Sequence, residues 1–123
     1  MRVPADELAL EMEVGDIVTR GEEWGTLSMR YLTLPPGADF TPLFVGLPGD
    51  LCQSAHWGYV VSGSIHVRYA DGTAEVTRAG DLYHWPAGHT GWTDEGVTFV
   101  ELSPADDVRP VLEHVSAQLA PPS

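Results

Sequence analysis

The sequence predicts a single all-β domain, a sandwich or barrel of short strands followed by one helix. At 123 residues the chain has the usual length of one domain, and 43% of its residues are hydrophobic, which is enough to bury a core. Between positions 22 and 101, short runs rich in β-branched and aromatic residues are broken roughly every eight to twelve residues by Gly, Pro, Asp or Thr. We therefore take residues 1–123 as one all-β domain.

Strands are predicted wherever these runs lie between turn signals. The strongest hairpin signal is Asp71-Gly72, because the two-residue turn that this pair favours needs positive φ at both positions. Helical spacing occurs near the two ends, at 5–14 and 110–119, and the second window places its apolar residues along one stripe. The predicted strands are 25–34, 56–61, 64–69, 74–77, 82–85 and 98–102.

The chain is strongly acidic, with 18 Asp and Glu against 6 Lys and Arg and a formal net charge of −12 at pH 7. Nucleic acid and anionic membrane surfaces would repel it, so neither is expected as a partner. Cys52 is the single cysteine, so no disulfide can form within the chain, and a reducing compartment is the simplest setting. The N-terminal segment lacks the apolar region of a signal peptide, and no run reaches membrane-spanning length. We expect a cytoplasmic protein.

Two short motifs lie in the second half of the chain. The first, about residues 50–63, ends in HWGYVVSG, and the second, about residues 80–91, contains GDLYHWPAG. Together they resemble the two motifs of the cupin superfamily, and CQSAHWGYVVSG followed by PAGHTGW is similar to a group of small bacterial cupins. The resemblance implies a cupin-type jelly-roll β-sandwich or barrel with a short C-terminal helix. It also implies a homodimer, because cupins often pair through their sheets.

The resemblance further indicates where a metal would bind. In the family's first motif, two histidines one residue apart precede a glutamate, and the glutamate position falls on His56. The paired histidines then fall on Asp50 and Cys52, or one position earlier if the loop is one residue longer. The last histidine of the second motif falls on Gly91. His89, two residues earlier, would keep the same face of an extended strand.

The candidate metal ligands are therefore His56, His89, Cys52 and His84. Neutral imidazoles and a thiolate suit a divalent transition metal such as Fe, Mn, Ni, Cu or Zn. The structural alternatives are a buried inert imidazole for His56, an exposed loop position for His89 and a small core residue for Cys52. The direction of His84 depends on which of its neighbours face the core. Asp50 follows a Pro-Gly pair and is assigned to the turn rather than to the metal.

The residues after His56 give two conflicting directions for this side chain. Periodicity alone leaves His56 in solvent together with His66 and Arg68. The cupin resemblance turns His56 into the barrel, in which case His66 and Arg68 also face the pocket and Arg68 could bind a carboxylate. Trp85 and Trp92 flank the second motif and are expected to wall an apolar pocket. The apolar side of the alternation comprises Trp57, Tyr59, Val61, Ile65, Val67 and Tyr69.

Three functions fit these residues. The first is a metal-dependent oxygenase, isomerase or lyase that acts on a small carbonyl or enol substrate. The second is a metal-free isomerase or cyclase in which His56 is the catalytic acid or base in an aromatic pocket. The third is a non-catalytic protein that binds a small molecule. Activity that survives a chelator would separate the second function from the first.

Overall fold

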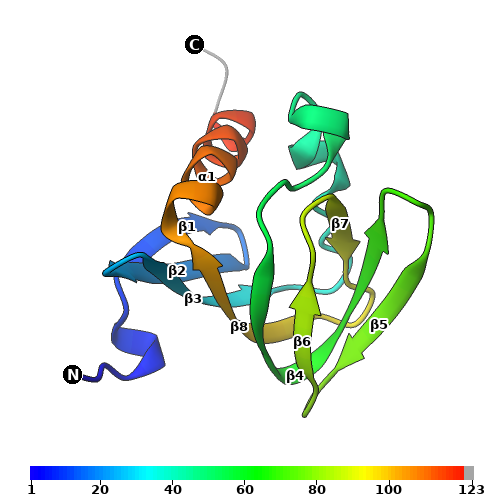
Figure 1. Ribbon diagram of the computed structural model, residues 1–123. Helices are drawn as coiled ribbons and strands as arrows, with labels where there is room; N and C mark the ends of the chain where they lie inside the picture. Colours follow the sequence, from blue (N-terminus) through cyan, green and yellow to red (C-terminus); the bar gives the residue numbers. More distant parts are fainter. Residues whose placement is uncertain (121–123) are drawn as a thin grey trace.

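The structure, a computed structural model, describes residues 1–120. Eight antiparallel strands and a C-terminal helix make up these residues, which confirms the predicted all-β class (Figure 1). The strands are β1 Leu10–Val14, β2 Ile17–Trp24, β3 Leu27–Leu34, β4 His56–Tyr69, β5 Ala74–Arg78, β6 Leu82–Trp85, β7 His89–Trp92 and β8 Val97–Pro104. The helix is α1 Ala105–Leu119, and the 3-10 helices are η1 Ala5–Glu7, η2 Thr41–Phe44 and η3 Pro48–Asp50.

The strands form two sheets that share the long strand β4. One sheet runs in the order β1-β2-β3-β8-β4 and ends with β6, which pairs with the first half of β4. The other sheet places the second half of β4 between β5 and β7. Strand β4 therefore joins the two sheets, with its first half in one sheet and its second half in the other.

Strand β4 changes its inward-facing side half-way along. In its first half His56 and Val60 are buried, whereas in its second half Ile65 and Val67 are buried. The buried side chains are thus even-numbered in the first half of β4 and odd-numbered in the second half. The prediction from periodicity, that one side of this segment is apolar and buried along its whole length, is therefore wrong. His56 is turned into the core, as the cupin resemblance implies.

A β-bulge produces this change of side. The pairing of β4 with β8 shifts register between Val60 and Ser62. Next to the shift, Gly63 has a φ of +75°, and a Cβ at this position would collide with the backbone of Gly96. A glycine is therefore required here, and the extra residue of the bulge reverses the alternation beyond it.

Two terminal predictions are corrected by the structure. Residues 5–14 do not form a helix but the 3-10 turn η1 followed by β1, which pairs with the unpredicted strand β2. Strand β7 also lies outside the predicted strands. Helix α1 begins at Ala105 rather than at Pro110, since Asp106 and Asp107 provide the acidic first turn that favours a helix N-terminus.

The hairpin turn between β4 and β5 also differs from the predicted two-residue turn. Gly72 has a φ of +87°, but Asp71 does not have positive φ, and residues 70–73 all lie outside the strands. The carboxylate of Asp71 accepts hydrogen bonds from the Thr73 amide at 2.9 Å and from its hydroxyl at 2.6 Å. The aspartate thus stabilises a longer turn through its side chain.

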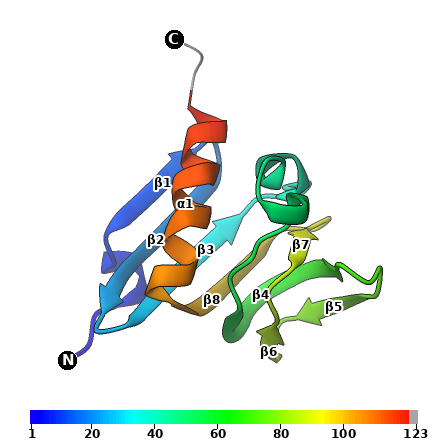
Figure 2. The ribbon, with the colours of Figure 1, turned by 45° about the horizontal axis from the view of Figure 1, so that its top comes forward.

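The core consists of two apolar clusters. The larger lies between the sheets and includes Val60, Trp85 and Phe99. The smaller joins α1 to η2 through Phe44 and Val111. Helix α1 packs against η2, β8 and β3, so it lies over the inner side of the sheet (Figure 2).

Among residues 1–120, no helix has the length and apolar character needed to cross a bilayer.

Candidate metal centre

A cavity of about 70 Å³ lies between the sheets and the inner face of α1. Its walls are mainly apolar and come from η2, α1 and every strand except β5. Among the residues that line this space, Cys52, His56 and His89 form a group whose ligand atoms lie close enough together to hold one metal ion. The structure therefore brings together three of the four predicted ligands.

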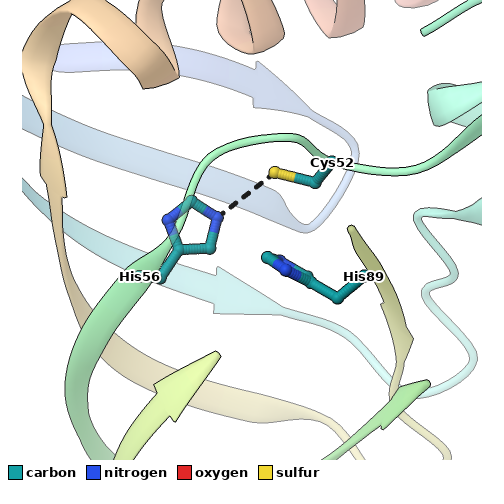
Figure 3. A group of neighbouring side chains, drawn as sticks. All are labelled: Cys52, His56 and His89. Carbon is teal, nitrogen blue, oxygen red and sulfur yellow. Dashed lines mark hydrogen bonds between the residues drawn. The ribbon is translucent and has the colours of Figure 1, made fainter. Parts of the chain in front are cut away.

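The ligand atoms of Cys52, His56 and His89 all lie within 4.8 Å of one another, and all three residues are buried (Figure 3). His56 begins β4 and His89 begins β7. Cys52 precedes β4, and its backbone is hydrogen-bonded to the second motif. The Cys52 amide donates to the His89 carbonyl at 2.8 Å, and the Gly88 amide donates to the Cys52 carbonyl at 2.7 Å. These backbone bonds bring the two distant motifs to one place.

Hydrogen bonds fix the orientation of both imidazole rings. Nδ1 of His89 lies 2.8 Å from the carbonyl oxygen of Pro86. Because a carbonyl only accepts, Nδ1 carries the proton, and Nε2 keeps a free lone pair. Nδ1 of His56 lies 2.6 Å from Ser103 Oγ, and its Nε2 lies 3.4 Å from Cys52 Sγ. Both rings thus have one nitrogen held by the fold and one available at the cluster, the arrangement typical of metal-binding histidines.

Burial determines the protonation of the three groups. Burial lowers the pKa of His56 to about 4 and also lowers the pKa of His89. Both imidazoles are therefore neutral at pH 7 and able to donate a lone pair. Burial raises the pKa of the Cys52 thiol to about 12. A metal that bound here would have to displace the thiol proton, so its affinity would rise with pH.

A buried acid and base border the cluster, and the sequence reading does not include them. Arg30 Nη1 donates to Glu101 Oε2 at 2.7 Å, and Arg30 Nε donates to Glu11 Oε2 at 3.1 Å. Glu101 Oε1 lies 3.5 Å from Nε2 of His56. The alternation of buried and exposed side chains along each strand could have identified them. Glu101 shares the inward side of β8 with Ser103, and Arg30 is on the inward side of β3.

The opposite charges of Glu101 and Arg30 keep both side chains ionised. Burial acts to raise the pKa of Glu101, but two attractions outweigh it and the pKa is lowered: that of the His56 ring, which is protonated at the low pH where both groups titrate, and that of the Arg30 guanidinium. Burial acts to lower the pKa of Arg30, but the carboxylates of Glu101 and Glu11 outweigh it and the pKa is raised. A permanent carboxylate therefore lies beside the imidazole of His56.

His84 does not join the cluster, so its predicted role as a ligand is corrected. It lies on the outer side of β6, exposed, with its ring stacked on Trp57 at a centroid distance of 4.7 Å. The alternation of β6 turns its neighbours Tyr83 and Trp85 inward instead. Trp85 lines the cavity, as predicted, with its ring edge-on to His56 at 6.3 Å.

Three predicted pocket residues lie on the outer surface instead. His66 stacks on Trp92 with ring centroids 5.1 Å apart, and the guanidinium of Arg68 lies 5.7 Å from the centre of the same indole. None of the three lines the cavity. For His66 and Arg68 the reason is the bulge in β4, which turns the even-numbered residues outward beyond Gly63. Trp92 is the cross-strand partner of His66 on β7, so it lies on the same face. Asp50 serves the turn, as predicted: its carboxylate accepts a hydrogen bond from the Gly46 amide at 3.0 Å.

No family model and no curated protein sequence matches the chain. Several solved structures do match the chain. An RmlC-like cupin from Shewanella frigidimarina is 20% identical with a TM-score of 0.60, over 84% of this chain and 89% of that one. Oxalate decarboxylase from Lactobacillus farciminis, solved as a formate complex, is 23% identical with a TM-score of 0.58, over 81% of this chain. A putative ethanolamine utilization protein from Salmonella typhimurium is 15% identical, with a TM-score of 0.55 over 72% of this chain and 70% of that one.

The chain spans 31% of the Lactobacillus farciminis oxalate decarboxylase chain that it matches. The Bacillus subtilis oxalate decarboxylase, described with Mn(II) centres, is 22% identical, and the chain covers 28% of it. These likenesses show that the chain has the cupin jelly-roll fold, as its motifs predict.

Proposed function

We propose that this cupin-fold protein is a small metal-dependent enzyme that binds a divalent transition metal through His56, His89 and Cys52. The observation that carries the proposal is the convergence of the three buried ligand atoms within 4.8 Å at the wall of a mainly apolar cavity. Two neutral imidazoles and a thiolate suit Fe, Zn, Cu or Ni, and the carboxylate of Glu101 would extend the choice to Mn. Three protein ligands leave a coordination position for a substrate, as in catalytic sites.

The proposed reaction is that of an oxygenase, isomerase or lyase acting on a small carbonyl or enol substrate. When bound, the metal supplies a Lewis acid for a carbonyl oxygen. The apolar walls, with Trp85 among them, exclude water and strengthen electrostatic interactions inside the cavity. Glu101 is an ionised carboxylate close to the reacting atoms, which suits a group that accepts a proton from the substrate. Ser103 holds the ring of His56 in position.

A second candidate is a metal-free isomerase in which His56 is the general base. The contact that favours it is the 3.5 Å approach of Glu101 Oε1 to His56 Nε2, because a carboxylate stabilises the imidazolium formed when the ring takes a proton. This activity would survive treatment with a chelator, whereas the metal-dependent activity would be lost.

Elemental analysis of protein purified without a histidine tag tests the metal proposal. We expect about one metal ion per chain in the wild type, and loss of most of it in His56→Ala and His89→Ala. His84→Ala is the matched control, because it removes an exposed imidazole that does not line the cavity. Circular dichroism verifies that each variant is folded. Equal metal in the wild type and in His56→Ala would overturn the proposal.

We also propose that two copies of the chain associate through the outer side of the sheet formed by β3, β8, β4 and β6. This side carries Trp57, Tyr59 and Val61 at 45, 42 and 45% exposure, together with exposed Leu82. Large apolar groups gathered on one exposed sheet face are typical of interaction surfaces. Two chains of net charge −12 would meet most easily where acidic side chains are few. Trp57→Glu should shift the molar mass measured by light scattering from dimer to monomer, and an unchanged mass would contradict this interface.

The proposed setting is the cytoplasm, because a free thiol at the metal site needs a reducing compartment. The proposed partner is the small-molecule substrate itself.

A further inference from the structure

We propose that the cavity binds a short carboxylate, whose oxygens accept hydrogen bonds from Arg30 and Thr19 on the inner face of β2 and β3. This rests on the proposed metal site and names the class of substrate that the site would take. Three features support it: the unused hydrogen-bond donors of Arg30, the unpaired hydroxyl of Thr19 near it, and the sum of the buried charges.

Arg30 is a buried cation that keeps more than half of its hydrogen-bond donors free. The residue lines the cavity and is 7% exposed. Its Nε donates to both carboxylate oxygens of Glu11, at 3.1 and 3.3 Å, and its Nη1 donates to Glu101 at 2.7 Å. A guanidinium has five N–H donors, so three of them, including both on Nη2, have no partner among residues 1–120. Free donors on a guanidinium suit the two oxygens of a carboxylate.

Thr19 adds a hydroxyl group near Arg30. Thr19 pairs with Leu32 across β2 and β3, and Arg30 lies two residues before Leu32 on the same inward side. Thr19 lines the cavity and is 3% exposed, and its buried hydroxyl oxygen has no hydrogen-bond partner among residues 1–120. Buried hydroxyl groups in folded proteins almost always have a partner. A carboxylate oxygen in the cavity would accept a hydrogen bond from this hydroxyl.

The buried charges around the cavity sum to one positive charge when a divalent metal is bound. The dication and Arg30 bring three positive charges, the thiolate of Cys52 and the carboxylate of Glu101 bring two negative charges, and the two imidazoles are neutral. Glu11 is left out of this sum because it does not line the cavity and is exposed to solvent, which screens its charge. A ligand with one carboxylate brings the sum to zero. An uncharged ligand would leave the positive charge buried and uncompensated, which is unfavourable.

The size and the walls of the cavity limit the rest of the ligand. A volume of about 70 Å³ holds on the order of five water-sized groups. The surrounding apolar side chains, such as Leu32, Phe40 and Ile65, suit a hydrocarbon remainder. A carboxylate with roughly one to three further carbon atoms fits these limits. A short oxo acid belongs to this class, and its carbonyl group suits the Lewis-acid chemistry of the proposed function.

Acetate and acetamide are suitable probes because they have the same shape and differ in charge. Each is titrated into the cobalt(II)-loaded protein, and binding is followed by the cobalt absorption spectrum and by the unfolding midpoint. We expect acetate to bind about tenfold or more tightly than acetamide. Equal binding of the two probes, or tighter binding of acetamide, would overturn the charge argument.

Two variants test whether Arg30 and Thr19 bind the carboxylate, because acetate could also bind through the metal alone. Thr19→Val keeps the shape of the side chain, so it should weaken acetate binding about tenfold while leaving the unfolding midpoint of the ligand-free protein equal or higher. Its control is Thr33→Val, at an exposed position of β3. Arg30→Lys keeps a cation beside Glu101 but loses the guanidinium fork, so it should also weaken acetate binding about tenfold. Its control is Arg20→Lys, on the other side of β2 and outside the lining of the cavity.

The outcomes distinguish this inference from the metal proposal. Absence of a thiolate-to-cobalt absorption band in the wild type would refute the metal site, and with it the charge sum on which this inference rests. Circular dichroism and the same band verify that each variant is folded and holds its metal. With the band intact, acetate binding that is unaffected by Thr19→Val, or by a folded Arg30→Lys, would overturn the carboxylate site alone.

Discussion

Acidification should destabilise the metal-free protein through His56. The pKa of this histidine is 6.5 before burial and about 4 in the folded protein, with burial as the main cause. Between these two pH values the unfolded chain holds one more proton than the folded chain, so stability rises with pH through this window and is lost as the pH falls. The slope is about 1.4 kcal/mol per pH unit, which gives a loss of about 2.5 kcal/mol between pH 7.5 and pH 4.5.

Urea unfolding followed by tryptophan fluorescence, at several pH values across this range, measures the effect. His89 acts in the same direction, because burial lowers its pKa too. The informative quantity is therefore the difference in slope between the wild type and His56→Gln. We expect the variant to lose about 2.5 kcal/mol less than the wild type over the range.

An equal slope in the wild type and in His56→Gln would refute this reasoning. It would mean that the ring of His56 keeps access to solvent in the folded protein, so burial could not be the cause of its neutrality. The argument for a neutral metal-binding imidazole at position 56 would then lose its physical basis.

Three further predictions follow from single contacts. Ser103→Ala, which removes the partner of His56 Nδ1, should weaken metal binding about 10- to 100-fold in a competition titration with a chelator, with the fold unchanged by circular dichroism. Arg30→Met leaves the carboxylate of Glu101 buried without its cation, and should lower the free energy of unfolding at pH 7 by about 3–5 kcal/mol in urea. Gly63→Ala should lower the same quantity by about 2 kcal/mol or more, because the bulge needs positive φ and leaves no room for a Cβ; an unchanged urea midpoint would contradict this account of the bulge.

The strand rhythm and the Gly and Pro positions were sufficient to predict the fold class, because turns and alternation are local properties of the chain. The terminal strands were harder to predict. The apolar spacing of residues 5–14 fits a helix as well as it fits β1, and only pairing with β2 decides between them. The assignment of side chains to faces failed within β4, because one bulge residue reverses every position beyond it.

The candidate site was predicted in part. His56, His89 and Cys52 were identified from the motif positions, although their convergence depends on backbone bonds between Cys52 and β7 that no spacing reveals. Glu101 and Arg30 were missed. Their charges are typical of surface residues, and only the cross-strand register between β3 and β8, which pairs them directly, shows that they neutralise each other in the interior.

The attachment of Cys52 to the second motif has an evolutionary consequence. The amide and carbonyl groups of residue 52, rather than its sulfur atom, join it to His89 and Gly88, so the architecture tolerates exchange of the side chain at this position. The side chain itself is 1% exposed and packs with Phe44, Val111 and Val115, so a replacement of similar or smaller volume, such as serine or alanine, keeps these backbone bonds. If the proposed metal site is correct, a laboratory selection for a different metal preference should therefore begin at position 52.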